Sequence, residues 1–190
     1  MRHARIERET GETTVLVEFD LDGSGATTIA TGIEFFDHML DAFATHGRFD
    51  LTAEATGDFD HHIAEDTMIA LGRALEVAID DKRGIRRVGH ALFPMDDALA
   101  MVALDLSGRS YSEIDIVFND THLADLRADL YVHLLETFAS NAHCNLHAEV
   151  LRGENDHHKA EAVAKGLGAA LDEAVTVVGD DVPSTKGTIE

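Results

Sequence analysis

The sequence predicts an α+β fold made by tandem duplication of one half-domain. Residues 60–75 and 156–171 are identical at nine of sixteen positions, namely Asp, His, His, Ala, Glu, Leu, Gly, Ala and Leu. Strand-like and helix-like segments also follow one another in the same order in each half of the chain. A repeat that keeps both its residues and its element order indicates one structural unit present twice.

We call residues 60–75 and 156–171 the first and second His/Glu box. The repeat extends well beyond these boxes. A shift of 95 residues pairs His38 with His133, and a shift of 85 residues pairs Asp20 with Asp105. The connections therefore differ in length while the units correspond. We expect a single domain, residues 1–190, made of two repeats at about 1–84 and 85–180 followed by a C-terminal tail.

In the first repeat, "TTVLVEFDLDGSG" (13–25) is a strand-like run that breaks at Asp-Gly and Ser-Gly turns. "GIEFFDHMLDAFATHG" (32–47) carries apolar residues at helical spacing and stops at Gly47. "FDLTAEATG" (49–57) alternates as a short strand does. "HHIAEDTMIALGRALEVAIDD" (61–81) again has the helical period.

The second repeat gives the same order of signals. Residues 98–118 are strand-like and continue past a Ser-Gly turn into another strand, and residues 144–153 form a further short strand. Residues 123–142 and 157–178 carry helical periodicity. Each half is therefore an α+β unit whose helices cover one face of a mixed sheet.

The composition is that of a globular domain. With 190 residues, of which 45% are hydrophobic, the chain can fill a core. No apolar run approaches the roughly 18 residues of a membrane span, and "MRHARIERET" has no apolar signal region, so we expect a cytoplasmic protein. The single Cys144 has no disulfide partner in the chain, so a metal site would use nitrogen and oxygen ligands.

The formal net charge of −21 excludes broad binding to nucleic acids or anionic membranes, because both are polyanions. An acidic chain either attracts cations or presents the solvated surface of a protein from a salty cytoplasm. The carboxylates are scattered and not gathered on one motif, which favours the second, halophilic interpretation.

Six of the twelve histidines fall at repeat-equivalent positions. Together with two glutamates they make eight candidate metal ligands: His38, His61, His62, Glu65, His133, His157, His158 and Glu161. On a helix, His and Glu four residues apart project to one side and form a potential chelating pair. The adjacent His is rotated by about 100° and could serve a different metal.

The alternative is that Asp60 and Asp156 are N-cap residues and that the histidines and glutamates only complete helix starts. Two boxes in register, each preceded by an equivalent His on the previous helix, favour the metal site. A nitrogen and oxygen ligand set suits Mn²⁺, Fe²⁺, Co²⁺ or Zn²⁺ and disfavours Cu⁺. We expect His46, His143 and His147 to be structural or to support the ligands.

Few basic residues occur in this acidic chain, and several stand beside a glycine or a helix start. They are joined by one hydroxyl in a candidate phosphate-binding set: Arg87, Arg109, Lys159, Ser184 and Lys186. Guanidinium forks and ammonium groups are suited to hold a phosphate. The alternative is that each cation pairs with a surface carboxylate.

In this order, the motifs "FFDHML", "DHHxxEDTxxALGxAL", "DLSGR", "NDHHKxE" and "PSTKG" resemble imidazoleglycerol-phosphate dehydratase over nearly the whole chain. The resemblance implies half-domains that are each a four-stranded mixed sheet with two helices on one face, like domain 2 of ribosomal protein S5. It implies two Mn²⁺ ions per active site and a homo-oligomer of 24 subunits with shared sites. It also implies dehydration of D-erythro-imidazole-glycerol phosphate to imidazole-acetol phosphate in histidine biosynthesis.

Matched position by position, the resemblance assigns the eight candidates as metal ligands and the five-residue set to the substrate phosphate. Glu12 and Asp96 match acidic positions near the imidazole and glycerol of the substrate. Gly11 stands where a Lys is more usual, and Ser110 stands where a Pro is usual. Neither departure touches a ligand.

The carbons that react in such a dehydration lie beside an imidazole and not beside a carbonyl, so the proton that is lost has little acidity without a metal. Two manganese ions, one on each ring nitrogen, would hold the imidazole as an imidazolate and stabilise the electron-rich intermediate. Glu65 or Glu12 would move the proton, and a metal or Asp96 would assist the departing hydroxyl. The alternatives are a dinuclear metal hydrolase, which would release inorganic phosphate, and a metal store or sensor, which needs no phosphate site.

Overall fold

The structure, a computed structural model, describes residues 2–189. The first half contains β1 (His3–Glu9), β2 (Thr13–Asp20), β3 (Thr27–Ala30), α1 (Glu34–Gly47), β4 (Asp50–Gly57) and α2 (Asp60–Ile79). The second contains β5 (Val88–Met95), β6 (Ala98–Asp105), β7 (Tyr111–Asp115), β8 (His122–Leu123), β9 (Leu126–Arg127), α3 (Ala128–Asn141), β10 (Asn145–Arg152) and α4 (Asp156–Val175).

The two halves have the same sheet topology. The first sheet has the strand order β1-β2-β4-β3 and the second has β5-β6-β10-β7. In each sheet the last pair, β4 with β3 and β10 with β7, is parallel and the other pairs are antiparallel. The predicted duplicated α+β fold with mixed four-stranded sheets is confirmed.

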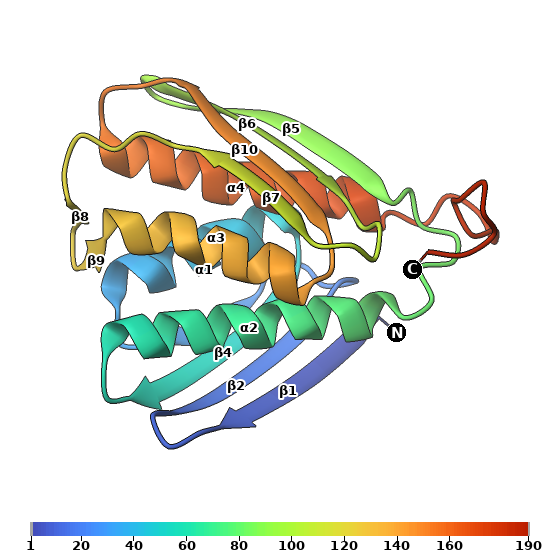
Figure 1. Cartoon of the computed structure of the whole chain (residues 1–190), viewed down its shortest axis with the longest axis horizontal. Coiled ribbons are helices and arrows are strands. Elements are labelled where there is room, and N and C mark those ends of the chain that lie inside the picture. Colours follow the sequence, from blue (N-terminus) through green and yellow to red (C-terminus); the bar gives the residue numbers. More distant parts are fainter. Residues whose placement is uncertain (1, 190) are drawn as a thin grey trace.

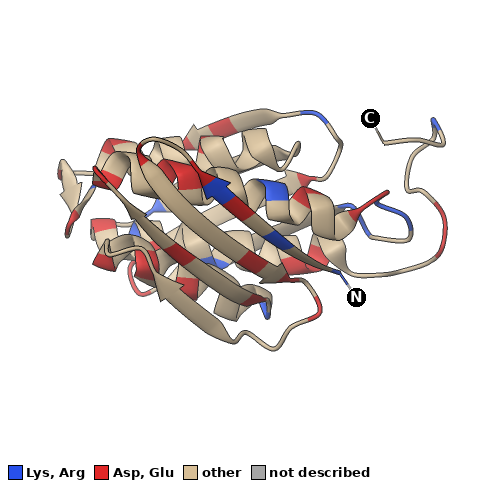
Figure 2. Cartoon of the chain, turned by 90° about the horizontal axis from the view of Figure 1, so that it is seen from below, with Lys and Arg blue, Asp and Glu red and all other residues tan. Residues whose placement is uncertain are grey.

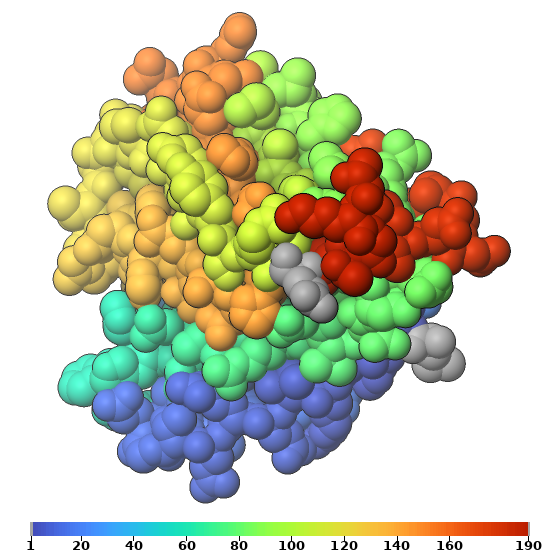
Figure 3. Space-filling view, turned by 45° about the vertical axis from the view of Figure 1, so that its right-hand side comes forward, coloured from blue at the N-terminus to red at the C-terminus, as the bar shows by residue number. Residues whose placement is uncertain are grey.

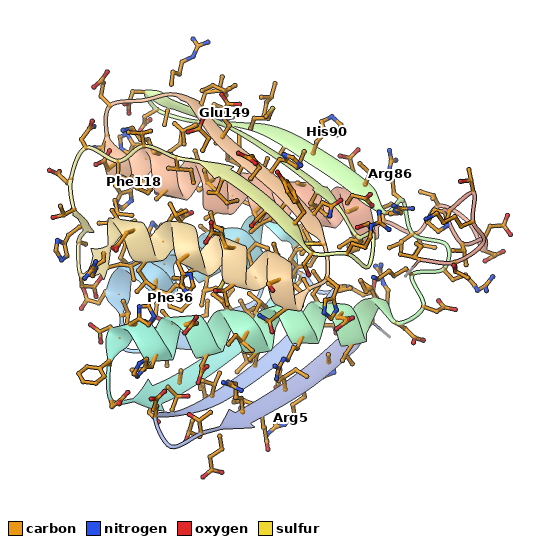
Figure 4. All side chains as sticks on the ribbon, in the orientation of Figure 1. Arg5, Phe36, Arg86, His90, Phe118 and Glu149 are labelled. Atoms are coloured by element: carbon orange, nitrogen blue, oxygen red, sulfur yellow. The ribbon has the colours of Figure 1, made fainter. Side chains whose placement is uncertain are left out.

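The helices lie between the two sheets, so the molecule has a sheet, helix, helix, sheet arrangement (Figure 1). Helix α1 packs against α4 and helix α2 packs against α3, which means that each helix contact joins the two halves. Apolar side chains from both halves form one buried cluster. Phe36 lies among the helices, whereas Arg5 and His90 point outward from the sheets (Figure 4).

Several elements differ from the prediction. β1 and β5 were not predicted, because only Ala4 in β1 and Gly89 in β5 are fully buried and the hydrophobic alternation is therefore weak. The four-residue β3 was also missed. Helix α3 begins at Ala128, five residues later than predicted, because the β8–β9 hairpin occupies the preceding residues. Helix α4 ends at Val175, before the predicted end.

Acidic residues are spread over many strands and helices of the face seen in Figure 2. This distribution agrees with carboxylates that are scattered and not gathered on one motif. Among the described residues, no helix is long and apolar enough to cross a membrane.

Glycines allow the close helix contacts between the halves. A Cβ added to Gly168 of α4 would clash with the carbonyl oxygen of Phe43 and lie 2.9 Å from the nitrogen of Gly47, both in α1. A Cβ added to Gly72 of α2 would lie 2.9 Å from the carbonyl oxygen of Phe138 in α3. These atoms belong to backbone, so they can move little and the helices depend on glycine to approach this closely.

We predict that Gly168→Ala lowers the free energy of unfolding by about 1–3 kcal/mol, although alanine is the better helix former. Urea unfolding at fixed protein concentration measures it. Gly179→Ala is the control, because nothing lies within 4 Å of a Cβ added there. Equal stabilities of the two variants would contradict the role of this helix contact.

Candidate functional site

Three candidate ligands meet where α1 crosses the start of α4. His38 comes from α1, and His157 and Glu161 come from the first turns of α4. Glu161 Oε2 lies 3.0 Å from His157 Nε2 and 3.4 Å from His38 Nε2. We call these residues the α1/α4 cluster. It combines a histidine from the first half with a His/Glu pair from the second.

The equivalent three residues meet where α3 crosses the start of α2. Glu65 Oε1 lies 2.8 Å from His133 Nε2, and Glu65 Oε2 lies 3.8 Å from His61 Nε2. This α2/α3 cluster takes its histidine from the second half and its His/Glu pair from the first. The two clusters are therefore related by the internal duplication.

Both clusters have the geometry of a metal site. In each, one ligand atom per residue lies within 4.8 Å of the others. Ligands about 2.1 Å from one ion are separated by roughly 3.0–3.5 Å, which is close to the separations within both clusters. Each cluster could hold a divalent ion through two imidazole nitrogens and a carboxylate.

Glu161 is the more buried of the two glutamates, with 9% of its side chain exposed against 33% for Glu65. Burial raises the pKa of Glu161, but the ammonium of Lys165, 2.7 Å from Glu161 Oε1, together with His38 and His157 outweighs burial and keeps the pKa below its ordinary value. The carboxylate is thus held in the ionised form that binds metal.

His62 and His158 do not join the cluster of their own helix. His62 Nδ1 donates to Asp58 Oδ1 at 2.8 Å, and His158 Nδ1 donates to Asp97 Oδ1 at 2.6 Å. The Asp58 hydrogen bond raises the pKa of His62. A histidine whose Nδ1 is held by a carboxylate presents Nε2 as a possible metal ligand, and neither His62 nor His158 belongs to the three-residue cluster of its helix.

The predicted acidic residues lie beside these two histidines. Glu12 Oε2, in the β1–β2 turn, is 3.8 Å from His62 Nδ1. Asp96 Oδ2, in the β5–β6 turn, is 3.5 Å from His158 Nε2. The two carboxylates therefore lie in equivalent turns of the two halves, although the 85-residue shift pairs Glu12 with Asp97 and not with Asp96.

Asp60 and Asp156 are not N-cap residues, contrary to the capping alternative. Each is the first residue of its helix, and the N-caps are Phe59 and Asn155. Asn155 accepts a hydrogen bond from the backbone of His158.

Four of the five phosphate-binding candidates line one cleft: Arg87, Arg109, Ser184 and Lys186. The cleft lies between the C-terminal tail and the second half of the chain, against which the tail packs (Figure 3). Arg87 is held by Asp105, with Nε 2.6 Å and Nη2 2.9 Å from its two carboxylate oxygens, and it donates to the carbonyl of Pro183. Asp105 thus fixes the guanidinium at the cleft.

Lys159 lies apart from this cleft. Its side chain is 6% exposed, and its ammonium donates to Asp156 at 2.8 Å and to the carbonyl oxygen of Val117 at 3.0 Å. Burial raises the pKa of Asp156, but the hydrogen bonds from Lys159 and two backbone amides outweigh it and lower the pKa. Lys159 therefore has a structural partner inside the protein.

Lys165 was not among the sequence candidates. It contacts Glu161 of the α1/α4 cluster from the next turn of the same helix. The four-residue spacing between Glu161 and Lys165 is the sequence signal that could have identified this contact.

The clusters and the cleft lie at opposite ends of the molecule. His157 is in the first turn of the 20-residue α4. The backbone N–H of Arg87, by contrast, donates to the carbonyl oxygen of Ala174 in the last turn of α4. At 1.5 Å per residue this helix is about 30 Å long. In Figure 1, α2 and α4 begin at the left and the tail lies at the right. That separation exceeds the length of an imidazole, a three-carbon chain and a phosphate.

The fold and site define a duplicated α+β protein with a pair of equivalent His/Glu clusters suited to divalent metal. A sequence profile of imidazoleglycerol-phosphate dehydratase matches residues 31–171. The chain belongs to this family, whose members are carbon–oxygen lyases that remove water.

Relatives match over the full length. The chain is 50% identical over 192 residues to imidazoleglycerol-phosphate dehydratase of Methanothermobacter thermautotrophicus, covering 100% of this chain and 98% of that one. It is also 50% identical over 194 residues to that of a Roseiflexus species, covering 99% and 98%. The crystal structure of IGPD, the enzyme of this family, from Pyrococcus furiosus superposes on this chain with a TM-score of 0.86 at 37% identity. The superposition covers 96% of this chain and 99% of that one.

We predict that Lys159→Met lowers the free energy of unfolding by about 3–5 kcal/mol, because it leaves the carboxylate of Asp156 buried without its partner. The KM for imidazoleglycerol phosphate should stay unchanged. Lys186→Met, in the cleft, should show the reverse: normal stability and a raised KM. A raised KM with normal stability in Lys159→Met would show that Lys159 binds the phosphate.

Proposed function

We propose that this protein dehydrates D-erythro-imidazole-glycerol phosphate to imidazole-acetol phosphate in histidine biosynthesis. The observation that carries the proposal is the pair of equivalent His/Glu clusters, since one reaction on an imidazole ring can use both. The family membership and the cleft lined by cationic side chains support it. As an enzyme of amino-acid biosynthesis, the protein would act in the cytoplasm.

The proposed cofactor is Mn²⁺, two ions per active site. Imidazole and carboxylate ligands without sulfur suit this ion. When bound, the ions would supply Lewis acidity to the ring nitrogens and hold the substrate ring as an imidazolate, which would help to expel the hydroxyl from the ring-attached carbon as the next carbon loses its proton. The eight predicted residues would be the ligands. His62 and His158 would complete sites other than the cluster on their own helix.

Carboxylates of this chain would move the protons. Glu12 and Asp96 lie at equivalent turns beside His62 and His158, so they can face a substrate from two sides. We propose Glu12 or Glu65 as the group that takes the proton from carbon, and Asp96 as the group that protonates the departing hydroxyl. Glu65 is the more exposed of the two cluster glutamates, which supports a role in proton transfer besides metal binding.

The phosphate of the substrate would bind in the cleft. Arg87 and Arg109 offer guanidinium groups, Lys186 an ammonium and Ser184 a hydroxyl. Lys159, already paired with Asp156, is not needed for this set. Lys165 contacts Glu161 and has 16% of its side chain exposed, so it is the lysine of the second half that is better placed to contact substrate.

The active site would be shared between subunits. The metal clusters and the phosphate cleft of one chain lie too far apart for one substrate to use both. His62 and His158 also lie outside the cluster of their own helix. A homo-oligomer, proposed as a 24-mer, would bring the cleft of one subunit to the clusters of another, and the metal would favour that assembly.

We predict that protein treated with a chelator loses all turnover and recovers it with Mn²⁺. Product ketone and inorganic phosphate are measured separately with imidazole-glycerol phosphate as substrate. Ketone without phosphate release supports dehydration. Release of inorganic phosphate would instead identify a metal-dependent hydrolase, and full turnover by metal-free protein would overturn the proposal.

We predict that two inactive variants restore activity when they are dissociated, mixed and reassembled with Mn²⁺. His38→Ala removes a cluster ligand, and Arg109→Ala removes a cleft residue. In a mixed oligomer, an intact cluster from one chain can meet an intact cleft from the other, giving up to about a quarter of wild-type turnover. Each variant reassembled alone is the control. A mixture that stays inactive would contradict sites shared between chains.

A further inference from the structure

The β1–β2 turn, which carries Glu12, is tied to the interior of the protein by a buried polar network. Asp66, in the second turn of α2, is 7% exposed. Its carboxylate accepts a hydrogen bond from the hydroxyl of Thr13 and lies 3.0 Å from the Nε of Arg8, as an ion pair without hydrogen-bond alignment. Thr13 is itself 3% exposed.

The network continues into the turn. Thr13 Oγ1 lies 3.2 Å from Thr10 Oγ1, and that hydroxyl oxygen accepts the backbone N–H groups of Glu12 at 3.1 Å and Thr13 at 3.0 Å. The carbonyl of Glu12 accepts from the backbone of Asp58, whose carboxylate holds His62. The Glu12 backbone is therefore fixed from both sides.

The second half shows that this network is not a requirement of the fold. By the 85-residue shift of the strands and the 96-residue shift of the helices, Arg8, Thr13 and Asp66 correspond to Phe93, Ala98 and Ala162. Ala98 and Ala162 are 2% and 0% exposed. The same architecture thus folds around apolar residues at these positions. Burying the carboxylate of Asp66 beside the partly exposed Arg8 instead costs free energy, which calls for another benefit.

We propose that Asp66 is a positioning residue that sets Glu12 against His62 through Thr13 and Thr10, an inference that rests on the proposed role of Glu12 in proton transfer. Asp66 is adjacent to Glu65 on α2, so one helix would place both the cluster and the turn with the proposed acid–base group. A shift of about 1 Å in such a group can cost up to about a hundredfold in rate.

The test is Thr13→Val, which removes the hydroxyl and keeps the shape. Turnover (kcat) should fall at least about tenfold, with KM and bound Mn²⁺ unchanged. Deuterium uptake in a peptide that contains residues 10–14 should rise, because the turn has lost the hydrogen bond from Thr13 to Asp66. Thr13→Ser should restore kcat. Thr14→Val, at an exposed position on the opposite face of β2, is the matched control and should behave as wild type.

A second variant keeps the test decisive if Thr13→Val folds poorly. The triple change Arg8→Phe, Thr13→Ala and Asp66→Ala copies the packing of the second half. It should fold and bind Mn²⁺ with low kcat.

Wild-type kcat in both variants would overturn the inference, as would loss of Mn²⁺ in proportion to kcat. A wild-type protein that does not form ketone would instead refute the proposed function. The deuterium uptake would still report whether Thr13 holds the turn.

Discussion

The contact between helices from opposite halves is the interaction on which the site depends. Helix α4 packs on α1 and α2 packs on α3, with Gly168 and Gly72 allowing their backbones to approach closely. A single box offers one His/Glu pair on one side of a helix. The cross-half contact adds the third ligand, His38 to one box and His133 to the other. Duplication thus creates two metal-competent clusters from a unit that alone would form neither.

The two halves share this helix packing but differ in the polar groups that hold the β1–β2 turn and the β5–β6 turn. The first half holds its turn through Asp66 and Thr13, from inside the protein. The second holds the equivalent turn through Asp97, which binds His158 and accepts the backbone N–H groups of Glu154 and Asn155. The two turns therefore hold their carboxylates, Glu12 in the first and Asp96 in the second, in different surroundings. Such a difference suits a reaction that needs one base and one acid.

Much of the fold could be predicted because helical periodicity and the internal repeat are properties of short segments. β1 could not, since charged side chains cover its outer face and one buried alanine gives little signal. The His/Glu pairs followed from four-residue spacing. The sequence could not show which histidine joins which pair. Repeat equivalence relates His38 to His133, but it does not say that each of them joins the His/Glu pair of the other half.

The two lysines of the second box illustrate the same limit. Lys159 and Lys165 both stand near metal-site candidates in the sequence. Lys159 is buried and donates hydrogen bonds to Asp156 and to the carbonyl oxygen of Val117, 42 residues away in the sequence. Lys165 contacts Glu161 and stays partly exposed. Only tertiary contacts separate these roles, and spacing along the chain cannot.

The most direct test is a crystal structure of the Mn²⁺-loaded protein with anomalous diffraction measured at the manganese edge. We expect two peaks per chain, one within about 2.2 Å of ligand atoms of His38, His157 and Glu161 and one equally close to those of His61, Glu65 and His133. His62 or His158 of a neighbouring subunit should complete each site. Peaks away from both clusters, or at only one of them, would contradict the pairing of the halves as the origin of the metal centre.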